Sequence, residues 1–506
     1  MVYVLDFGSQ YSHLIVRRIR ELGVFAELVS PHTSLETLKT AEALILSGGP
    51  QNLSESSALR VDKGVFNLGL PMLGVCYGLQ LMAYELGGKV KAGKKREYGP
   101  ATVTVKRTNA LFKGLRPSQQ TWMSHGDEVS VLPKGFANIG TSTNSKIAAI
   151  ANETKKFYGI QFHPEVTQTA NGMKILDNFL KQAKVKRTWS MHDYLALSVK
   201  QIREKVGKKL AVCALSGGVD SAVAAAMVHK AIGKQLYCIY VDTGLMRAGE
   251  TEQVEKTFKQ HFKMNLLVVR AEKEFLQKLA GVTDPERKRK IIGELFIRIF
   301  EREAKKFGKA DFLVQGTLYT DAISSGVSVG KTAALIKSHH NVGGLPEKMG
   351  FKLVEPLREL YKDEVRRLGT LLCLPDGIVH RQPFPGPGLA VRIIGEVTKE
   401  KLGLLRQADA IVREEIGKSS EVKNIQQYFA VLPDIKSVGV QGDSRSYGYP
   451  IIVRAINTVD FMTAHWAKLP HELLEKISSR ITNEVRGINR VAYDITSKPP
   501  ATVEWE

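Results

Sequence analysis

One cysteine of the chain stands where a thiol could act as a nucleophile. Cys76 follows the apolar run Met72 to Val75 and precedes the amphipathic stretch Leu79 to Leu86, with Gly74 and Gly78 on either side. This order of strand, sharp turn and helix is typical of a nucleophile elbow, with cysteine in place of serine. The N–H groups and dipole of a helix N-terminus favour the thiolate. A buried cysteine in a glycine-rich turn would give the same five letters, so the pentapeptide alone leaves both interpretations open.

A base and an orienting carboxylate occur further along the chain. The strand-like segment 157–162 ends in His163 and Glu165. Residues two apart at the end of a strand lean to one side. We therefore expect His163 to act as the base for a Cys76 nucleophile, with Glu165 orienting the imidazole. The glycine turn Ser47 to Pro50 follows another predicted strand and could offer an N–H group to an oxyanion.

A second cluster of small residues suggests a phosphate-binding loop. The predicted strand Leu210 to Leu215 runs into this cluster, and the apolar helix Ala222 to Ile232 follows it. Small side chains let the backbone approach an anion, and the N–H groups at the helix start face it. Asp220 suits Mg²⁺ rather than phosphate, because magnesium takes carboxylate and phosphate oxygens. The loop residues expected to bind the nucleotide are Ser216, Gly217, Gly218, Val219, Asp220, Ser221 and Ala222.

The elements that position these residues follow from the apolar pattern. From residue 1 to about 180, short apolar strands, among them Val2 to Leu5, Ala43 to Leu46 and Met72 to Val75, alternate with helical patterns. This alternation predicts a parallel α/β sheet. The polar, basic stretch Lys181 to Thr188 is predicted to be a linker, and a second α/β unit restarts at Lys209. Proline and glycine at 383–388 forbid regular structure there. We predict domains at residues 1–185, 190–385 and 386–506, the last a mixture of strands and helices.

Composition places the chain among ordinary folded proteins. Of its 506 residues, 43% are hydrophobic and 24% are charged, and at about 150 residues per domain this length fits roughly three domains. No run approaches the roughly 18 apolar residues of a membrane span, and the N-terminal strand pattern has no charged leader. We therefore expect a cytoplasmic location and no membrane partner.

The net charge of +21 calls for anionic partners. Two basic runs, at 94–96 and 287–290, would suit nucleic acid, but such runs are also typical of solvated helix faces. No recognition motif accompanies them, so we expect small phosphorylated substrates and no nucleic acid. The cysteines form no C-x-x-C pair, which argues against a zinc site or a disulfide framework. They are Cys76, Cys213, Cys238 and Cys373.

Together, the Cys76 elbow, the His163 to Glu165 motif and the Ser47 to Pro50 turn resemble the class I glutamine amidotransferase family, in the family's order. The resemblance covers residues 1 to about 180. It implies a flavodoxin-like sheet and hydrolysis of the glutamine side-chain amide through a γ-glutamyl thioester on Cys76. Gln80 and the segment Ser124 to Asp127 also stand where that family has residues near its glutamine pocket.

The loop Ser216 to Ser221 resembles that of the N-type ATP pyrophosphatase family. That resemblance implies an adenine-nucleotide α-hydrolase-like fold, with Mg²⁺ and with ATP as a substrate. The family cleaves ATP to AMP and pyrophosphate while a substrate oxygen is adenylated. It includes NAD, asparagine and argininosuccinate synthetases and tRNA thiolases, and fusion to a cysteine glutaminase narrows this choice.

Downstream segments resemble the GMP synthase family and extend the resemblance over the whole chain. They are 337–346, 383–388, 441–443 and the tail 493–506. The resemblance implies that XMP is adenylated at its C2 oxygen and that ammonia displaces AMP. It also implies a homodimer, formed by a smaller α+β domain at the C-terminal end. By the same resemblance, four residues are expected near XMP: Arg289, Asp443, Lys498 and Glu504.

Two other classes of protein compete with this interpretation. A tRNA-thiolating protein would share the nucleotide loop and the basic charge, but it would need a second reactive cysteine near that loop. Cys213 and Cys238 fall in the middle of predicted strands, where core packing is the more natural role. A glutaminase-like binding module without activity would form no thioester on Cys76.

Overall fold

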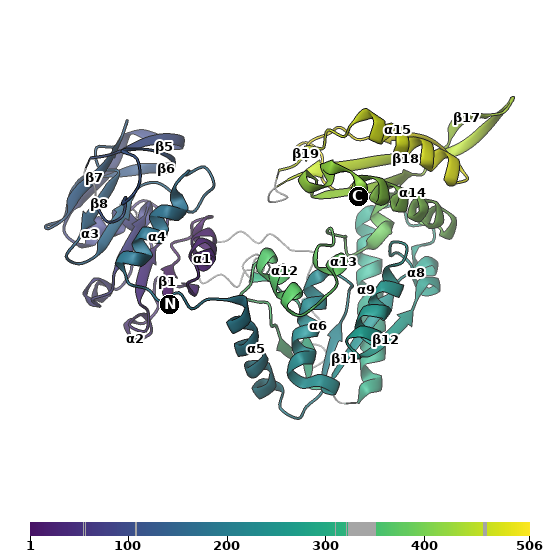
Figure 1. The fold of residues 1–506 in the computed structure, drawn as a ribbon, viewed down its shortest axis with the longest axis horizontal. Coiled ribbons are helices and arrows are strands. Elements are labelled where there is room, and N and C mark those ends of the chain that lie inside the picture. Colours follow the sequence, from purple (N-terminus) through teal and green to yellow (C-terminus); the bar gives the residue numbers. More distant parts are fainter. Residues whose placement is uncertain are drawn as a thin grey trace. The chain divides into compact units, whose positions relative to one another are not determined.

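The computed structural model describes residues 1–506 except 54, 56, 107–108, 309, 320, 322–350 and 459–462. The described residues form two compact units, residues 1–194 and residues 195–506. Figure 1 draws the first unit in purple and blue and the second in teal, green and yellow. The segment 337–346, which contributed to the family resemblance, lies outside the described residues.

A nine-stranded sheet forms the centre of the first unit as described. Five strands run parallel, in the order β2-β1-β3-β4-β9, and the remaining four extend the sheet with antiparallel pairing. The carboxyl ends of the parallel strands therefore share one edge. The parallel strands are β1 (Val2–Leu5), β2 (Ala26–Val29), β3 (Ala43–Leu46), β4 (Met72–Val75) and β9 (Phe157–Ile160); the others are β5 (Lys89–Val105), β6 (Ser118–Val131), β7 (Ala137–Ser142) and β8 (Ala149–Asn152).

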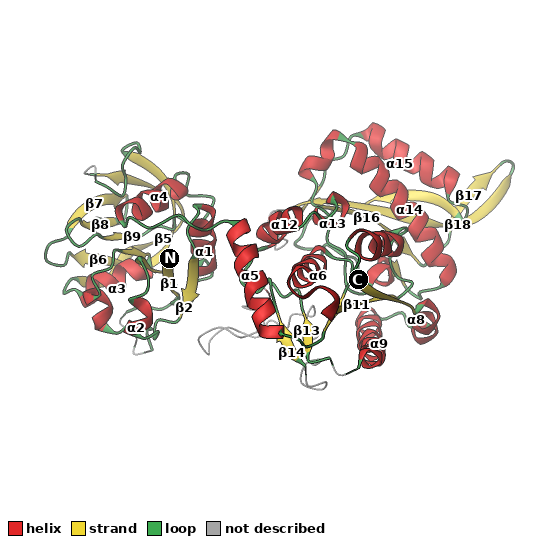
Figure 2. Cartoon of the chain, turned by 60° about the horizontal axis from the view of Figure 1, so that its bottom comes forward, coloured by secondary structure: helices red, strands yellow, loops and turns green. Residues whose placement is uncertain are grey.

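Helices cover both faces of this sheet, as Figure 2 shows. Helices α1 (Ser12–Glu21) and α4 (Gly172–Gln182) pack with one set of strand side chains, and α2 (Leu35–Leu38) and α3 (Tyr77–Glu85) pack with the other. Strands buried on both faces read as continuous apolar runs rather than alternating ones. This explains why the sequence predicted β1, β3 and β4 with the bounds that the structure shows.

The polar stretch predicted to be a linker remains attached to the first unit. Helix α4 continues to Gln182, and beyond it the Trp189 N–H donates to the carbonyl of Gly23 at 3.0 Å. The Trp189 ring packs against Phe25 with centroids 5.0 Å apart, and the Arg20 guanidinium lies 5.0 Å from the Trp189 ring centroid. These contacts hold the stretch to the first unit, which ends at Tyr194 in the first turn of helix α5 (Met191–Val206).

A five-stranded parallel sheet, in the order β12-β11-β10-β13-β14, carries the first part of the second unit. Helix α6 (Val219–Ile232) lies against it and contacts α12 (Lys362–Leu371) and α13 (Asp376–Val379). Helices α8 (Glu272–Leu279) and α9 (Pro285–Ala304) pack in a different core, shared with β10 and β11. The strands are β10 (Ala211–Ala214), β11 (Leu236–Asp242), β12 (Asn265–Arg270), β13 (Phe312–Val314) and β14 (Lys352–Val354).

A mixed sheet with two long helices follows in the same unit. Its core is continuous with that of the parallel sheet, because Val212 and Ile239 belong to the same buried cluster as Leu405 and Ile451. The predicted division at residue 385 therefore stays a prediction. The elements are β15 (Ile393–Ile394), α14 (Lys399–Lys418), β16 (Gln427–Pro433), β17 (Ser437–Gln441), β18 (Ser444–Asn457), β19 (His465–Trp466), α15 (His471–Glu484) and β20 (Ile488–Tyr493).

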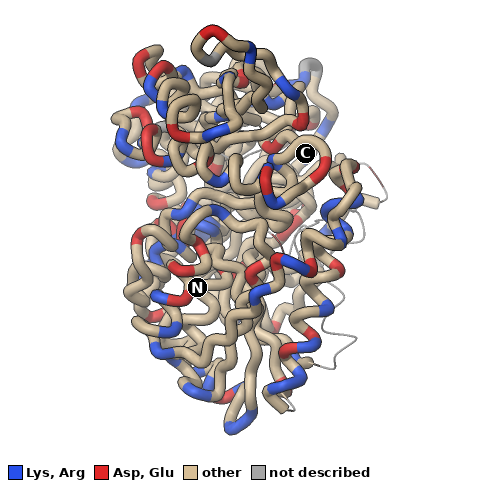
Figure 3. The backbone as a smooth tube through the Cα atoms, turned by 90° about the vertical axis from the view of Figure 1, so that its right-hand side faces the viewer, with Lys and Arg blue, Asp and Glu red and all other residues tan. Residues whose placement is uncertain are grey.

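Two surface properties bear on partners. No helix among the described residues is long and apolar enough to cross a membrane. In Figure 3, positions of lysine and arginine are interspersed with positions of aspartate and glutamate.

Candidate active site

The backbone at Cys76 has an unusual conformation. Cys76 joins β4 to α3 with φ of 51° and ψ of −107°, a region that costs free energy for any residue but glycine. The flanking glycines make this turn possible. A Cβ atom on Gly78 would lie 2.2 Å from the Leu46 carbonyl oxygen, and one on Gly74 would lie 2.6 Å from the Gly78 carbonyl carbon. The strained turn presents the thiol at the carboxyl edge of the sheet.

His163 and Glu165 follow β9, the strand next to β4, so the fold brings them to the thiol. The ring Nδ1 of His163 lies 2.7 Å from Glu165 Oε1, with both side chains almost wholly buried. The Cys76 side chain is close enough to the ring to raise the pKa of His163. The predicted triad residues are therefore together, in the order nucleophile, imidazole and carboxylate.

The turn Ser47 to Pro50 also lies at this place. The buried Ser47 hydroxyl accepts from the Phe7 N–H at 3.1 Å, which ties the turn to the end of β1. A Cβ atom on Gly48 would lie 3.2 Å from His163 Cε1, so the turn lies against the imidazole. Together with the first N–H groups of α3, which have no acceptor inside the helix, the turn provides donors around the thiol.

Burial acts on the pKa of His163 by disfavouring the cation, but the interactions of the ring with Glu165 and Cys76 outweigh it. They raise the pKa of His163 to about 10. At neutral pH the ring is therefore an imidazolium, paired with the Glu165 carboxylate. Because this pKa lies above the ordinary 6.5, the interactions of the charged ring stabilise the fold below pH 6.5, and that contribution is lost as pH rises through about 10.

Gln161 is a residue of this site that the sequence analysis missed. Its Nε2 lies 3.7 Å from Cys76 Sγ, so it can donate to a thiolate. Gln80, predicted to bind substrate, donates to the Asp127 carbonyl at 2.8 Å and to Gln161 Oε1 at 3.4 Å. The sequence could have predicted Gln161 as a site residue. It stands two residues before His163, so in an extended chain both side chains lie on the same side.

The second predicted site forms a closed loop between β10 and α6. Gly217 has φ of +77°, which glycine adopts without strain. The Ser216 and Ser221 hydroxyls lie 2.9 Å apart, and Ser221 also accepts from the Ser216 N–H at 3.2 Å. Hydrogen bonds between its own hydroxyl groups thus fix the shape of the loop. It lies at the N-terminus of a helix of 14 residues, where N–H groups attract a phosphate.

Two cations from distant parts of the sequence lie at this loop. Lys362, at the start of α12, places Nζ 2.7 Å and 2.6 Å from the two carboxylate oxygens of Asp220. Arg381 donates from Nη1 to the Gly217 carbonyl at 2.5 Å. Neither residue was foreseen, because 142 and 164 residues separate them from their partners.

The loop provides few ligands for a metal. Among the described residues, no group of three or more histidines, cysteines, aspartates or glutamates could hold an ion. Magnesium needs only one or two carboxylates when phosphate oxygens and water complete its shell. The partly exposed Asp220 carboxylate fits that requirement.

The four residues expected near XMP occupy different surroundings. Arg289 donates to the Glu506 main-chain carbonyl, and the Glu504 carboxylate accepts from Arg392 at 2.8 Å and 3.0 Å. Lys498 pairs through its backbone with Ala464. Asp443 is exposed in the turn between β17 and β18. Arg289 and the tail thus meet, whereas Asp443 belongs to a separate hairpin turn, and all four roles stay predictions.

The remaining buried cysteines belong to the core of the second unit. Cys213 and Cys238 are register neighbours on β10 and β11, and both are almost fully buried. The hydrogen bond with Cys213 and burial together raise the pKa of Cys238 well above its usual value. A thiol that resists ionisation is a poor nucleophile, so Cys238 does not suit the sulfur transfer of a tRNA-thiolating protein. Cys213 is 1% exposed and packs in the same core.

Family models match three separate parts of the chain. The family model for glutamine amidotransferase class I matches residues 3–183, that for NAD synthase matches 191–288, and that for the GMP synthase C-terminal domain matches 414–505. A solved structure, a glutamine amidotransferase from Thermotoga maritima, is 23% identical over 40% of this chain and 91% of its own, with a TM-score of 0.29.

Curated relatives match over the full length. A GMP synthase (glutamine-hydrolyzing) from Clostridium tetani is 55% identical over 509 residues, covering 100% of this chain and 99% of that protein. The protein of the same name from Clostridium botulinum strain Langeland is 56% identical with the same coverage.

The charge of His163 can be tested without any substrate. In a Glu165→Gln variant the carboxylate that raises the pKa of His163 is gone, so we expect that pKa to fall. Alkylation of Cys76 by iodoacetamide at pH 7 should slow, because a neighbouring cation favours the reactive thiolate and a neutral imidazole does not. NMR titration of His163 and mass spectrometry of the alkylated peptide measure the two effects.

The matched control is Glu153→Gln, which removes an exposed carboxylate that accepts from the Tyr158 hydroxyl. It should leave both the pKa of His163 and the alkylation rate unchanged. An unaltered pKa and rate in Glu165→Gln would show that Glu165 does not set the charge of the imidazole.

Proposed function

We infer that this chain, which belongs to the family of glutamine-hydrolysing GMP synthases, uses the two sites for the two halves of one reaction. The chain is a ligase that makes GMP from XMP: ATP adenylates XMP with release of pyrophosphate, and ammonia from glutamine displaces AMP. The observation that carries the assignment of residues is the strained Cys76 turn, with the His163 and Glu165 pair beside it.

In the proposed first half, the Cys76 thiolate attacks the side-chain amide carbon of glutamine. The oxyanion that forms is stabilised by N–H groups from the start of α3 and the Ser47 to Pro50 turn. The His163 imidazolium gives its proton to the nitrogen, and ammonia leaves behind a γ-glutamyl thioester. The neutral ring then takes a proton from water, which attacks the thioester and releases glutamate. Glu165 holds the ring orientation throughout.

In the proposed second half, the loop 216–222 binds the pyrophosphate part of ATP through backbone N–H groups. The C2 oxygen of XMP attacks the α-phosphorus, the bond to the β-phosphate oxygen breaks, and pyrophosphate leaves. Ammonia then attacks C2 and AMP departs with the former C2 oxygen. Lys362 sits where it can neutralise charge on the phosphates, since its ammonium already lies against Asp220 at the loop.

We propose Mg²⁺ as the metal of this site, with Asp220 as its protein ligand. Bound there, the ion would neutralise the charge that pyrophosphate develops as it leaves. The support for this is the chemistry of the donor: one accessible carboxylate at a phosphate loop, which is the usual setting for Mg²⁺. Since nucleotides and glutamine are abundant in the cytoplasm, we also propose that location.

A homodimer through the β17 and β18 hairpin is a further part of the proposal. The hairpin is drawn in yellow-green in Figure 1, and it exposes apolar side chains: Val440 is 78% exposed, Tyr447 66% and Val438 51%. Tyr447 is the register partner of Val438, so these residues share a face with Val440, two residues on. Monomers rarely expose such contiguous apolar surface.

The two halves should fail separately when their own residues are changed. Cys76→Ala removes the nucleophile, so glutamine should no longer support GMP formation, whereas added ammonium salts should, increasingly so as pH rises and more neutral NH₃ is present. Asp220→Asn should abolish AMP formation with either nitrogen source and leave glutamine hydrolysis measurable. Both variants are assayed for GMP, AMP and glutamate with each nitrogen donor.

GMP formation from glutamine by Cys76→Ala would show that another group is the nucleophile. Parental rates of adenylation by Asp220→Asn would remove that carboxylate from the ATP site. Loss of the ammonium reaction in a folded Cys76→Ala protein would contradict the independence of the two halves.

The dimer is tested by placing a charge on the hairpin. Val440→Glu should convert the protein to monomers, because an apolar contact cannot bury an unpaired carboxylate. Leu197→Glu, at another residue that is 55% exposed, should leave the mass unchanged. Light scattering after gel filtration gives the mass, and a parental protein that is already monomeric, or a Val440→Glu dimer, would refute this interface.

A further inference from the structure

A chain of buried charged side chains in the second unit begins at the ATP loop. Arg381, whose guanidinium donates to the Gly217 carbonyl of that loop at 2.5 Å, also contacts the buried carboxylate of Glu250. Glu250 starts helix α7 (Glu250–Val254). The loop backbone is thus connected through one arginine to a carboxylate that solvent does not reach.

Arg247 links Glu250 to Asp409, the next charged side chain of this row of ion pairs. Its Nη1 lies 3.8 Å from Glu250 Oε1 and its Nε lies 3.7 Å from Asp409 Oδ2. All three side chains are 3% exposed or less. The guanidinium also lies over the Phe384 ring, 4.3 Å from its centroid. Arg247 therefore bridges two acidic groups that belong to separate helices, α7 and α14.

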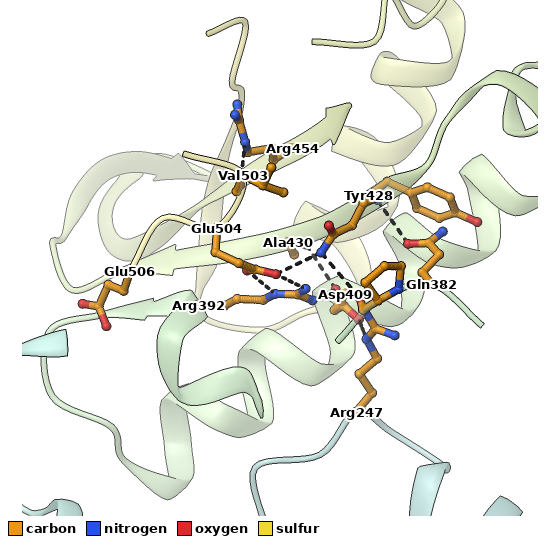
Figure 4. A network of polar contacts seen from close by, with 12 residues as sticks. Arg247, Gln382, Arg392, Asp409, Tyr428, Ala430, Arg454, Val503, Glu504 and Glu506 are labelled. Carbon is orange, nitrogen blue, oxygen red and sulfur yellow. Dashed lines mark hydrogen bonds and ion pairs between the residues drawn. The ribbon is translucent and has the colours of Figure 1, made fainter. Parts of the chain in front are cut away.

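The chain ends at the tail, as Figure 4 shows. Arg392 Nη1 lies 3.8 Å from Asp409 Oδ1, and the same guanidinium donates twice to Glu504 at 2.8 Å and 3.0 Å. Asp409 is held in place from behind, since its Oδ1 accepts from the Ala430 N–H at 3.1 Å. Glu504 is one of the residues expected near XMP, so the chain joins the two proposed substrate positions.

The middle of this chain is poorly satisfied. Distances of 3.7 Å and 3.8 Å are too long for hydrogen bonds, and buried charged groups are normally hydrogen-bonded. Burial lowers the pKa of Arg247 to about 10 despite its acidic neighbours. Several buried atoms of the chain have no hydrogen-bond partner among the described residues: Arg247 Nε and Nη2, Glu250 Oε1 and Oε2, Arg392 Nη1 and Asp409 Oδ2.

Such a cluster is weak as a stabilising device. Removing charges from water is costly, and an apolar core of the same volume is often at least as stable. Arg381 is hydrogen-bonded to the loop, and Arg392 is hydrogen-bonded to Glu504 in the tail. The distances from Arg247 to Glu250 and Asp409, in contrast, are longer than hydrogen bonds. A small displacement of Gly217 or Glu504 would therefore alter the bridging contacts of Arg247, so an event at one end changes the free energy of the other.

We propose that this ion chain couples ATP binding at the loop to XMP binding at the tail, with Arg247 as the positioning residue at its centre. The inference rests on the proposed function, which puts ATP at the loop, and on the prediction that Glu504 in the tail lies near XMP. Arg247 acts through Glu250 and Arg381 on the loop and through Asp409 and Arg392 on Glu504. It contacts neither substrate in this account.

Arg247→Lys tests the coupling directly. Lysine keeps the positive charge, but a single ammonium cannot bridge two carboxylates as a planar guanidinium does. Binding of α,β-methylene-ATP, which the enzyme cannot cleave between its α and β phosphorus atoms, is measured by calorimetry with and without XMP. In the parental protein we expect XMP to tighten binding by about fivefold or more, within the usual range of coupling between sites. In Arg247→Lys the effect of XMP should fall below about twofold.

Arg413→Lys is the matched control. Arg413 Nε lies 3.2 Å from the same Asp409 oxygen, but this pair lies within helix α14 and does not bridge to α7, so the substitution should leave the coupling at the parental value. Glu250→Gln serves as a second variant that keeps shape while removing the charge, and it should also reduce the coupling. Thermal unfolding of each variant shows that the protein is folded.

The outcomes separate this proposal from the proposed function. If the parental protein fails to bind the ATP analogue or XMP, the assignment of the substrates is wrong. If both bind and XMP has no effect on the analogue, or if folded Arg247→Lys and Glu250→Gln retain the parental coupling, the ion chain does not couple the sites. Equal loss in Arg413→Lys would show that any disturbance of Asp409 suffices, which overturns the role of Arg247.

Discussion

The contact of the His163 imidazolium with the Glu165 carboxylate and the Cys76 side chain is the interaction on which the chemistry of the first unit depends. It requires a thiol at a positive φ, which the close approaches at Gly74 and Gly78 permit. It also requires the imidazole on the neighbouring strand end, and the parallel pairing of β4 with β9 provides this. The interactions with Glu165 and Cys76 then outweigh the effect of burial on the pKa of His163. The fold thus holds a protonated imidazole beside Cys76 before glutamine arrives.

The second unit solves a different electrostatic problem, the binding of a highly charged nucleotide. Its loop offers N–H groups from a helix start, with only Asp220 as an acidic side chain in the loop and with Lys362 and Arg381 close by. The tail reaches the same unit through buried arginines, of which Arg454 binds the Val503 and Thr502 carbonyls. The loop, α12 and the C-terminal segment therefore each contribute charged groups to the second unit, where we propose that ATP and XMP bind.

What the sequence predicted well is what depends on neighbours along the chain. The strands at Val2–Leu5, Ala43–Leu46 and Met72–Val75 were predicted with their observed bounds, because strands buried on both faces are short, continuous apolar runs. The elbow at Cys76 was predictable for the same reason, since strand, glycine turn and helix are consecutive.

The sequence could not predict contacts between residues that are far apart along the chain. Lys362 and Arg381 reach the ATP loop only because the parallel sheet and α12 fold back on it, and Arg247 meets Asp409 across more than one element. No periodicity or spacing encodes such contacts. Composition predicts a linker at Lys181 to Thr188, because it does not reveal that the next residue, Trp189, packs on Phe25.

The central claim is that one unit releases nitrogen from glutamine while the other converts an XMP oxygen into a leaving group. A single reaction with XMP labelled by ¹⁸O at C2 and glutamine labelled by ¹⁵N in its amide tests it by mass spectrometry of the products. The account predicts GMP that carries ¹⁵N and no ¹⁸O, and AMP that carries the ¹⁸O in its phosphate. An ¹⁸O label in pyrophosphate or water, or GMP without ¹⁵N, would contradict it.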